Sequence, residues 1–103
     1  LGTGVPDVNA CWQGKEVWIE LKLGSPQSIN LSPQQCAWHM RRANAGGVSW
    51  ILSYHHSKRE IWLIPGIESI SLRERNLSSS DLIHHQTSPF DWKVLIKNIC
   101  MID

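Results

Sequence analysis

The sequence lacks the long apolar runs and paired cysteines that would suggest a membrane protein or a disulfide framework. No hydrophobic stretch is long enough to span a bilayer and no signal peptide is present, so we expect no membrane partner. The three cysteines, Cys11, Cys36 and Cys100, include no CxxC pair, which argues against a zinc knuckle. We therefore expect buried, reduced thiols and an intracellular location.

The chain also lacks a strong net charge, internal repeats and low-complexity tracts. Ten Lys and Arg residues stand against nine Asp and Glu residues, which leaves a formal net charge of +1. This balance argues against a protein that coats nucleic acid nonspecifically, although it permits a local basic face. With 103 residues and 42% hydrophobic side chains, the composition is typical of one globular domain covering residues 1–103.

Turn residues and hydrophobic periodicity predict where strands and helices form. Val5 to Trp12 and Glu16 to Leu23 are expected to form a hairpin, with Gly14 supplying a positive φ in the turn. The breaker-rich stretch Gly24 to Asn30 is expected to be a loop. Ser32 followed by Pro33 predicts a helix start, and the helix should continue to Ala45 before Gly46-Gly47.

The second half of the chain predicts two further strands and a last helix. Val48 to Tyr54 has the apolar, β-prone composition of a central strand, and Glu60 to Ile64 should pair back on it until Pro65-Gly66. Residues 67–87 give no clear pattern beyond a short helical turn. A helix is expected after Ser88-Pro89, with one apolar stripe formed by Trp92, Leu95, Ile96 and Ile99. This order predicts an α/β or α+β layered fold with a mixed, mostly buried central sheet flanked by helices.

The stretch from Gly4 to Lys22 contains the residue types that indicate chemistry. Side chains alternate along a strand, so Glu20 and Lys22 point to one side with their Cα atoms roughly 6.5 Å apart. The hairpin would return Asp7 alongside them. Two carboxylates and an ammonium suit phosphodiester hydrolysis, because carboxylates hold Mg²⁺, which neutralises the phosphate and activates a water. Lys22 would orient that water or stabilise the charge that develops on phosphorus.

The segments Pro6-Asp7 and Glu20-Leu21-Lys22 resemble the signature of the PD-(D/E)XK nuclease superfamily. A second segment is similar to the virus-type replication-repair nuclease branch (VRR-Nuc). It consists of Gly24, then the run from Leu31 to Gln35, with Trp38 and Gly46-Gly47 following. The likeness covers about residues 2–52. It implies a restriction-endonuclease-like core, and it implies that the catalytic residues are Asp7, Glu20, Lys22 and Gln35. It further implies a metal site formed by Asp7, Glu20 and the backbone carbonyl of Leu21, which takes Mg²⁺ or, as a substitute, Mn²⁺.

The sequence departs from this family at its beginning. Most members have a further acidic residue on a helix before the PD strand, and this chain has almost nothing there. Three explanations stay open: the helix lies outside the sequence, the acid is dispensable, or another subunit supplies it. The choice between one and two metal ions therefore stays open as well.

The resemblance implies a Mg²⁺-dependent DNA endonuclease of phage or bacterial replication, recombination or repair. Structure-selective cleavage of branched or Holliday-type junction DNA is expected, in the cytoplasm of a bacterium or a phage-infected cell. A site-specific or homing-type endonuclease is an alternative, and a catalytically silent DNA-binding module is another. The intact set of Asp7, Glu20 and Lys22 argues against the silent module, because a protein that only binds DNA gains nothing from carboxylates facing the phosphate.

Other side chains suggest contacts with DNA or with a second subunit. The candidate DNA-binding residues are Arg41, Arg42, Lys58 and Arg59, and Arg42 is preferred because it lies two turns beyond Gln35 on the same helix face. The histidine pairs at 55–56 and 84–85 are expected in loops, because adjacent side chains in a strand or helix point apart and cannot chelate together. Six tryptophans exceed what so small a core comfortably hides, which predicts a homodimer.

Overall fold

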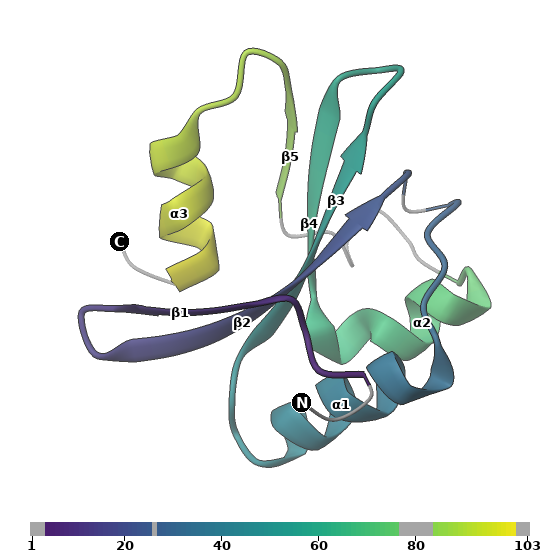
Figure 1. Cartoon of the computed structure of the whole chain (residues 1–103). Coiled ribbons are helices and arrows are strands. Elements are labelled where there is room, and N and C mark those ends of the chain that lie inside the picture. The colour runs from purple at the N-terminus through teal and green to yellow at the C-terminus, as the bar shows by residue number, and fades with distance from the viewer. Residues whose placement is uncertain (1–3, 26, 77–83, 101–103) are drawn as a thin grey trace.

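The computed structural model describes residues 4–25, 27–76 and 84–100. Its centre is a five-stranded sheet whose strands lie in chain order (Figure 1). The strands are β1 (Val8–Trp12), β2 (Lys15–Leu23), β3 (Ser49–His55), β4 (Glu60–Pro65) and β5 (His84–Thr87). β2 and β3 run parallel, and the other neighbouring pairs are antiparallel. The parallel pair requires a crossover, which α1 (Pro33–Asn44) provides.

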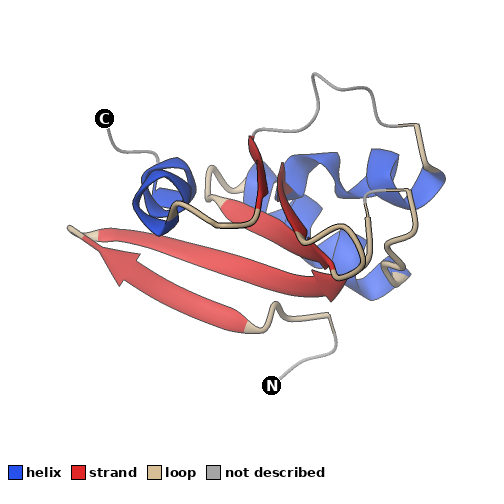
Figure 2. Cartoon of the chain, turned by 90° about the horizontal axis from the view of Figure 1, so that it is seen from above, coloured by secondary structure: helices blue, strands red, loops and turns tan. Residues whose placement is uncertain are grey.

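Helices lie on both faces of this mixed sheet. α1 and the short α2 (Ser69–Glu74), which follows a 3₁₀ turn (Gly66–Glu68), lie on one face. α3 (Trp92–Cys100) lies on the other face, and the view from above separates these layers (Figure 2). The predicted layered α/β architecture with a mixed sheet is confirmed at this level. Within the three described ranges, no helix has the length and apolarity needed to cross a bilayer.

Each face of the sheet has its own apolar core, because alternate side chains of β3 and β4 point to opposite faces. The core under α3 consists of Val17, Trp50, Ile61, Leu63, Leu95, Ile99 and Cys100. The core under α1 and α2 consists of Ile29, Leu31, Cys36, Ile51, Ile64 and Leu72. β3 is therefore covered on both faces, as its continuous apolar sequence predicts.

Local signals at turns and helix ends behave as predicted. Gly14 has φ +79° in the β1–β2 turn. Ser32 caps α1: its Oγ accepts a hydrogen bond from Gln35 N at 3.1 Å, and Gln35 Oε1 accepts one from Ser32 N at 2.9 Å. This reciprocal capping box, with Pro33 in the first turn, begins the helix where the sequence indicates.

Several details differ from the sequence predictions. β1 begins at Val8 rather than Val5, and α3 begins at Trp92, where Asp91 Oδ1 accepts a hydrogen bond from Val94 N at 3.1 Å. β5 and α2 occupy parts of the stretch that gave no clear pattern, while 77–83 lie outside the described residues. The apolar stripe of α3 is buried only in part, since Trp92 and Ile96 are exposed. Cys11 is also exposed, because it lies on the edge strand β1.

Candidate active site

The register of the hairpin places Asp7 opposite Glu20. The last paired residues are Val8 and Ile19, so the next position of this antiparallel register brings the two carboxylate residues together. Asp7 Oδ2 accepts a hydrogen bond from Leu21 N at 2.8 Å, which holds the carboxylate against the edge of β2. The predicted convergence of Asp7 on β2 is therefore present in the structure.

Pro6 explains why the ladder stops beside this site. Extension of the register would pair Pro6 with Leu21, but a proline nitrogen has no hydrogen to donate. In a strand the N–H and C=O of one residue point to the same side, so the Leu21 carbonyl faces the same edge as Asp7. Pro6 cannot donate to this carbonyl, and β1 therefore leaves an oxygen at the site available to another partner.

Glu20 is a buried carboxyl group with an unsatisfied oxygen. The residue is 2% exposed, and its Oε1 has no hydrogen-bond partner within the described part of the chain. Burial, together with the hydrogen bond to Asp7 and the charge of Asp7, raises the pKa of Glu20 to about 7 against the opposing effect of Lys22. The pKa of Asp7 is lowered, mainly by the hydrogen bond from Leu21 N. A lone buried oxygen of this kind is costly unless a partner arrives.

The donor atoms at this point are all oxygens, from Asp7, Glu20 and the Leu21 carbonyl. Such a set suits a hard divalent cation, and Mg²⁺ in particular binds through one or two carboxylates and keeps several waters. Across ranges 4–25, 27–76 and 84–100, no group of three or more His, Cys, Asp or Glu side chains gathers. A cation here would therefore have two side-chain ligands and would complete its shell with main-chain and water oxygens.

Lys22 is held by the first turn of α1. Its Nζ donates to Gln35 Oε1 at 3.0 Å, and the same oxygen accepts from Ser32 N as part of the capping box. The glutamine predicted to sit at the active site is thus beside Lys22. It positions the ammonium, and among the described residues it forms no hydrogen bond or ion pair to Asp7 or Glu20. An ammonium group has three donors, so one bond to Gln35 leaves two for other partners.

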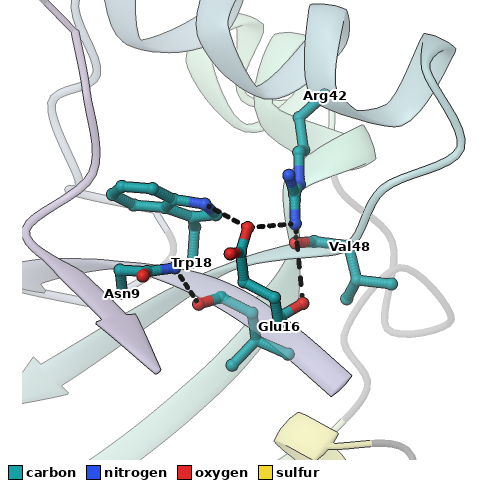
Figure 3. Close-up of polar contacts among 6 residues, drawn as sticks. Asn9, Glu16, Trp18, Arg42 and Val48 are labelled. Atoms are coloured by element: carbon teal, nitrogen blue, oxygen red, sulfur yellow. Dashed lines mark hydrogen bonds and ion pairs between the residues drawn. The ribbon is translucent and has the colours of Figure 1, made fainter. Parts of the chain in front are cut away.

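Arg42, the preferred candidate for contacting phosphate, is occupied by protein groups. Its Nη2 lies 3.3 Å from Glu16 Oε1, and its Nε donates to the Val48 carbonyl at 3.3 Å (Figure 3). Trp18 Nε1 donates to the same Glu16 oxygen at 3.2 Å. These contacts join the end of α1 to β2, and Figure 3 shows the guanidinium directed at Glu16.

The other candidate cations lie away from the carboxylates. Arg41 is exposed in the last turn of α1, at the end opposite Gln35. Lys58 and Arg59 are exposed in the turn between β3 and β4. No hydrogen bond or ion pair within the described residues joins Arg41, Lys58 or Arg59 to Asp7, Glu20 or Lys22. The structure therefore does not gather these cations around the site.

The histidines do not form a chelating pair. His84 and His85 lie in β5 rather than in a loop, and His55 is the last residue of β3. His85 Nε2 lies 2.6 Å from Glu60 Oε2, and the His85 ring stacks on Trp62 with centroids 4.0 Å apart. His84 contacts Gln86 instead. Neighbouring strand residues point apart, which is why the pair separates.

Two buried polar side chains beside the site were not anticipated. Ser53 pairs with Lys22 across β2 and β3, and Trp62 pairs with Ser53 across β3 and β4. Ser53 Oγ and Trp62 Nε1 are buried and lack hydrogen-bond partners within the described residues. Their positions depend on strand register between distant segments, so no local sequence motif predicts them.

Comparison with known proteins does not assign the chain to a family. No model of a known protein family matches the chain, and no curated protein sequence matches it. The resemblance to the VRR-Nuc branch therefore rests on the residues of the PD, ExK and LSPQQ segments.

Proposed function

We propose that this chain is a metal-dependent nuclease that hydrolyses DNA phosphodiester bonds at Asp7, Glu20 and Lys22. The observation that supports this most directly is the buried Glu20 oxygen beside the Asp7 carboxylate, which has no partner among the described residues, with the Lys22 ammonium two residues further along the same strand. A binding module that only neutralises phosphates would have cations here. Two carboxylates at the contact point favour hydrolysis.

The residues fit a divalent cation, with Mg²⁺ the expected ion and Mn²⁺ a substitute. Asp7, Glu20 and the Leu21 carbonyl would hold it, because the start of β1 brings these oxygens together beside β2. When bound, such a cation supplies charge neutralisation at the phosphate and a water of lowered pKa. In its absence Glu20 holds a proton near neutral pH, which keeps two adjacent negative charges from meeting.

Lys22 supplies positive charge that the protein fixes in advance. The bond to Gln35 Oε1 orients Nζ and consumes one donor. The two remaining donors are placed to bind a non-bridging phosphate oxygen or the attacking water. A positioned charge of this kind stabilises charge that develops in the transition state without reorganising. α1 therefore contributes to the site through Gln35, although it supplies no carboxylate.

Branched or Holliday-type junction DNA is the proposed substrate, and a homodimer is the proposed active unit. The described residues of one chain hold one such cluster, and a two-fold partner would place a second cluster against the opposite strand or junction arm. Exposed apolar side chains, including Ile67, Ile70 and Ile96, are consistent with a further contact surface. Light scattering over a dilution series tests the dimer, and a monomer mass at concentrations that support full cleavage would refute it.

A cleavage assay tests the proposed function. Its substrates are supercoiled plasmid, linear duplex, flap and four-way junction DNA, each with Mg²⁺, with Mn²⁺ and with a chelator. Metal-dependent cleavage that is lost in Asp7→Asn supports it. Glu74→Gln is a matched control, because Glu74 is an exposed carboxylate at the end of α2. DNA binding without cleavage in every metal would instead support the silent binding module. Cleavage confined to one duplex sequence would support a site-specific endonuclease.

A further inference from the structure

A groove of about 460 Å³ lies beside the candidate active site, on the face of the sheet that α3 covers. The residues that matter in it are Leu21 and Leu23 of β2, Tyr54 of β3, Phe90, and Trp92 at the start of α3. Three of these side chains face solvent to an unusual degree, at 49% for Leu21, 81% for Leu23 and 57% for Trp92. We call this surface the aromatic groove.

The aromatic rings of the groove are held in place by edge-to-face contacts rather than by parallel stacking on one another. Tyr54 and Phe90 meet edge to face with centroids 6.3 Å apart and planes at 83°. Phe90 and Trp92 do the same at 5.4 Å and 65°. Edge-to-face contacts orient rings and leave flat surface for another π-system. The groove therefore has the chemistry of a stacking site.

Leu21 connects the aromatic groove to the carboxylates. Its backbone N–H donates to Asp7, while its side chain lines the groove. Glu20 and Lys22 point to the opposite face, as strand alternation requires. A phosphate at Asp7 and Glu20 and a group in the groove would thus lie on either side of a single strand edge.

The groove is lined almost entirely by apolar and aromatic residues. Lys22 is the exception in the lining, and its ammonium is held by Gln35 on the other face of β2. Ser88 N donates to the Arg59 carbonyl at 2.8 Å, which ties the segment leading to Phe90 to the Lys58–Arg59 turn. No Asp or Glu of the described part of the chain lines the groove, and the nearby Asp91 accepts a hydrogen bond from Val94 N at its Oδ1. An apolar, aromatic groove beside a candidate phosphate site complements a nucleotide, which pairs a flat base with an anionic backbone.

We propose that the aromatic groove binds the base of an unpaired nucleotide in the DNA strand whose phosphate lies at Asp7 and Glu20. The inference rests on the proposed function for the identity of the ligand. A base inside a duplex is stacked on both sides, so only an unpaired or extruded base offers its face to Trp92. The groove would thereby favour branched DNA over continuous duplex.

Binding to short single-stranded DNA in the presence of a chelator tests this proposal apart from cleavage. One probe strand contains a single 2-aminopurine, whose fluorescence falls on stacking. A second, otherwise identical single strand has an abasic site at that position. We expect the abasic strand to bind on the order of tenfold more weakly, since stacking of one base commonly contributes that much. Trp92→Leu should abolish the difference, and Trp92→Tyr should retain most of it.

Trp12→Leu is the matched control, because Trp12 is 48% exposed at the far end of the β1–β2 hairpin. It should bind both strands like the unsubstituted protein. Equal affinity for the two strands, or an unchanged difference in Trp92→Leu, would overturn the proposal. A change from dimer to monomer in Trp92→Leu, seen by sedimentation, would show that a second copy of the chain occupies the groove instead. Base-dependent binding without metal-dependent cleavage would support the groove and refute the nuclease.

Discussion

Lys22 Nζ donates a hydrogen bond to Gln35 Oε1 over 3.0 Å, which links the candidate catalytic ammonium on β2 to the first turn of α1. The amide oxygen that accepts this bond also accepts Ser32 N. One side chain therefore completes a helix cap and orients a lysine. The cap and the site share a structural element, and their contributions can be separated by mutation.

Asp7→Asn and Glu20→Gln should each abolish cleavage while DNA binding stays the same or tightens. Each change replaces a metal-binding carboxylate with a neutral amide, which weakens metal binding. The same change removes a negative charge that would repel the phosphate. Cleavage assays and chelator-stabilised binding assays on the same preparations measure the two effects. Full cleavage by either variant would contradict the assignment.

Lys22→Ala should lower turnover by on the order of a hundredfold or more, as loss of one preorganised electrostatic contact commonly does. Affinity for Mg²⁺ should change little, because Lys22 supplies no oxygen ligand. Single-turnover cleavage at saturating metal, together with metal titration by calorimetry, checks this. If saturating metal restored full turnover, Lys22 would be acting through the metal site alone.

Gln35→Ala and Ser32→Ala should separate capping from lysine positioning. Both remove a partner of the capping box, so each should cost about 1 kcal/mol of unfolding free energy. Ser32→Ala retains the amide oxygen that Lys22 uses, whereas Gln35→Ala removes it. We expect kcat to fall strongly in Gln35→Ala and little in Ser32→Ala, with KM nearly unchanged in both. Equal losses of kcat would show that Gln35 acts only through helix stability.

Mg²⁺ affinity should rise with pH through about 7. The pKa of Glu20 is raised from its ordinary 4.5 to about 7, so the cation must displace a proton below that pH. By the same shift, the metal-free protein binds more protons than the unfolded chain between pH 4.5 and 7, so this group makes stability fall as pH rises through that window. Calorimetric titrations at several pH values measure the affinity, and Glu20→Gln should lose most of this dependence. A flat affinity profile would contradict the prediction.

His39 should make the protein sensitive to acid. Its ring is fully buried, its Nδ1 lies 2.7 Å from Ser49 Oγ, and burial lowers its pKa from 6.5 to about 4. The unfolded chain therefore takes up a proton first as pH falls below 6.5, and stability from this group is lost progressively down to about pH 4. Thermal unfolding as a function of pH measures the loss. His39→Gln should flatten the curve over this window, and an unchanged curve would assign the acid sensitivity to other groups.

Much of the fold follows from local patterns that the chain carries in short segments. The hairpin turn at Gly14, the Ser32–Pro33 helix start and the apolar run of β3 each depend on neighbouring residues, and all three are in the structure. Strand alternation alone places Glu20 and Lys22 on one face. The end of β1 also has a local cause, since Pro6 cannot donate to Leu21. The α3 stripe was predicted less well, because helical spacing identifies a face without showing how far a neighbour covers it.

The sequence by itself determined which residue types stand at the site and the order of the elements that hold them. Only the tertiary structure decided the burial of Glu20 and its raised pKa, the bond between Lys22 and Gln35, the pairing of Arg42 with Glu16, and the groove beside Leu21. The physical reason is the range of the interactions. Turns, caps and alternation act over a few residues, whereas burial and charge pairing depend on segments brought together by strand register and by the crossover of α1.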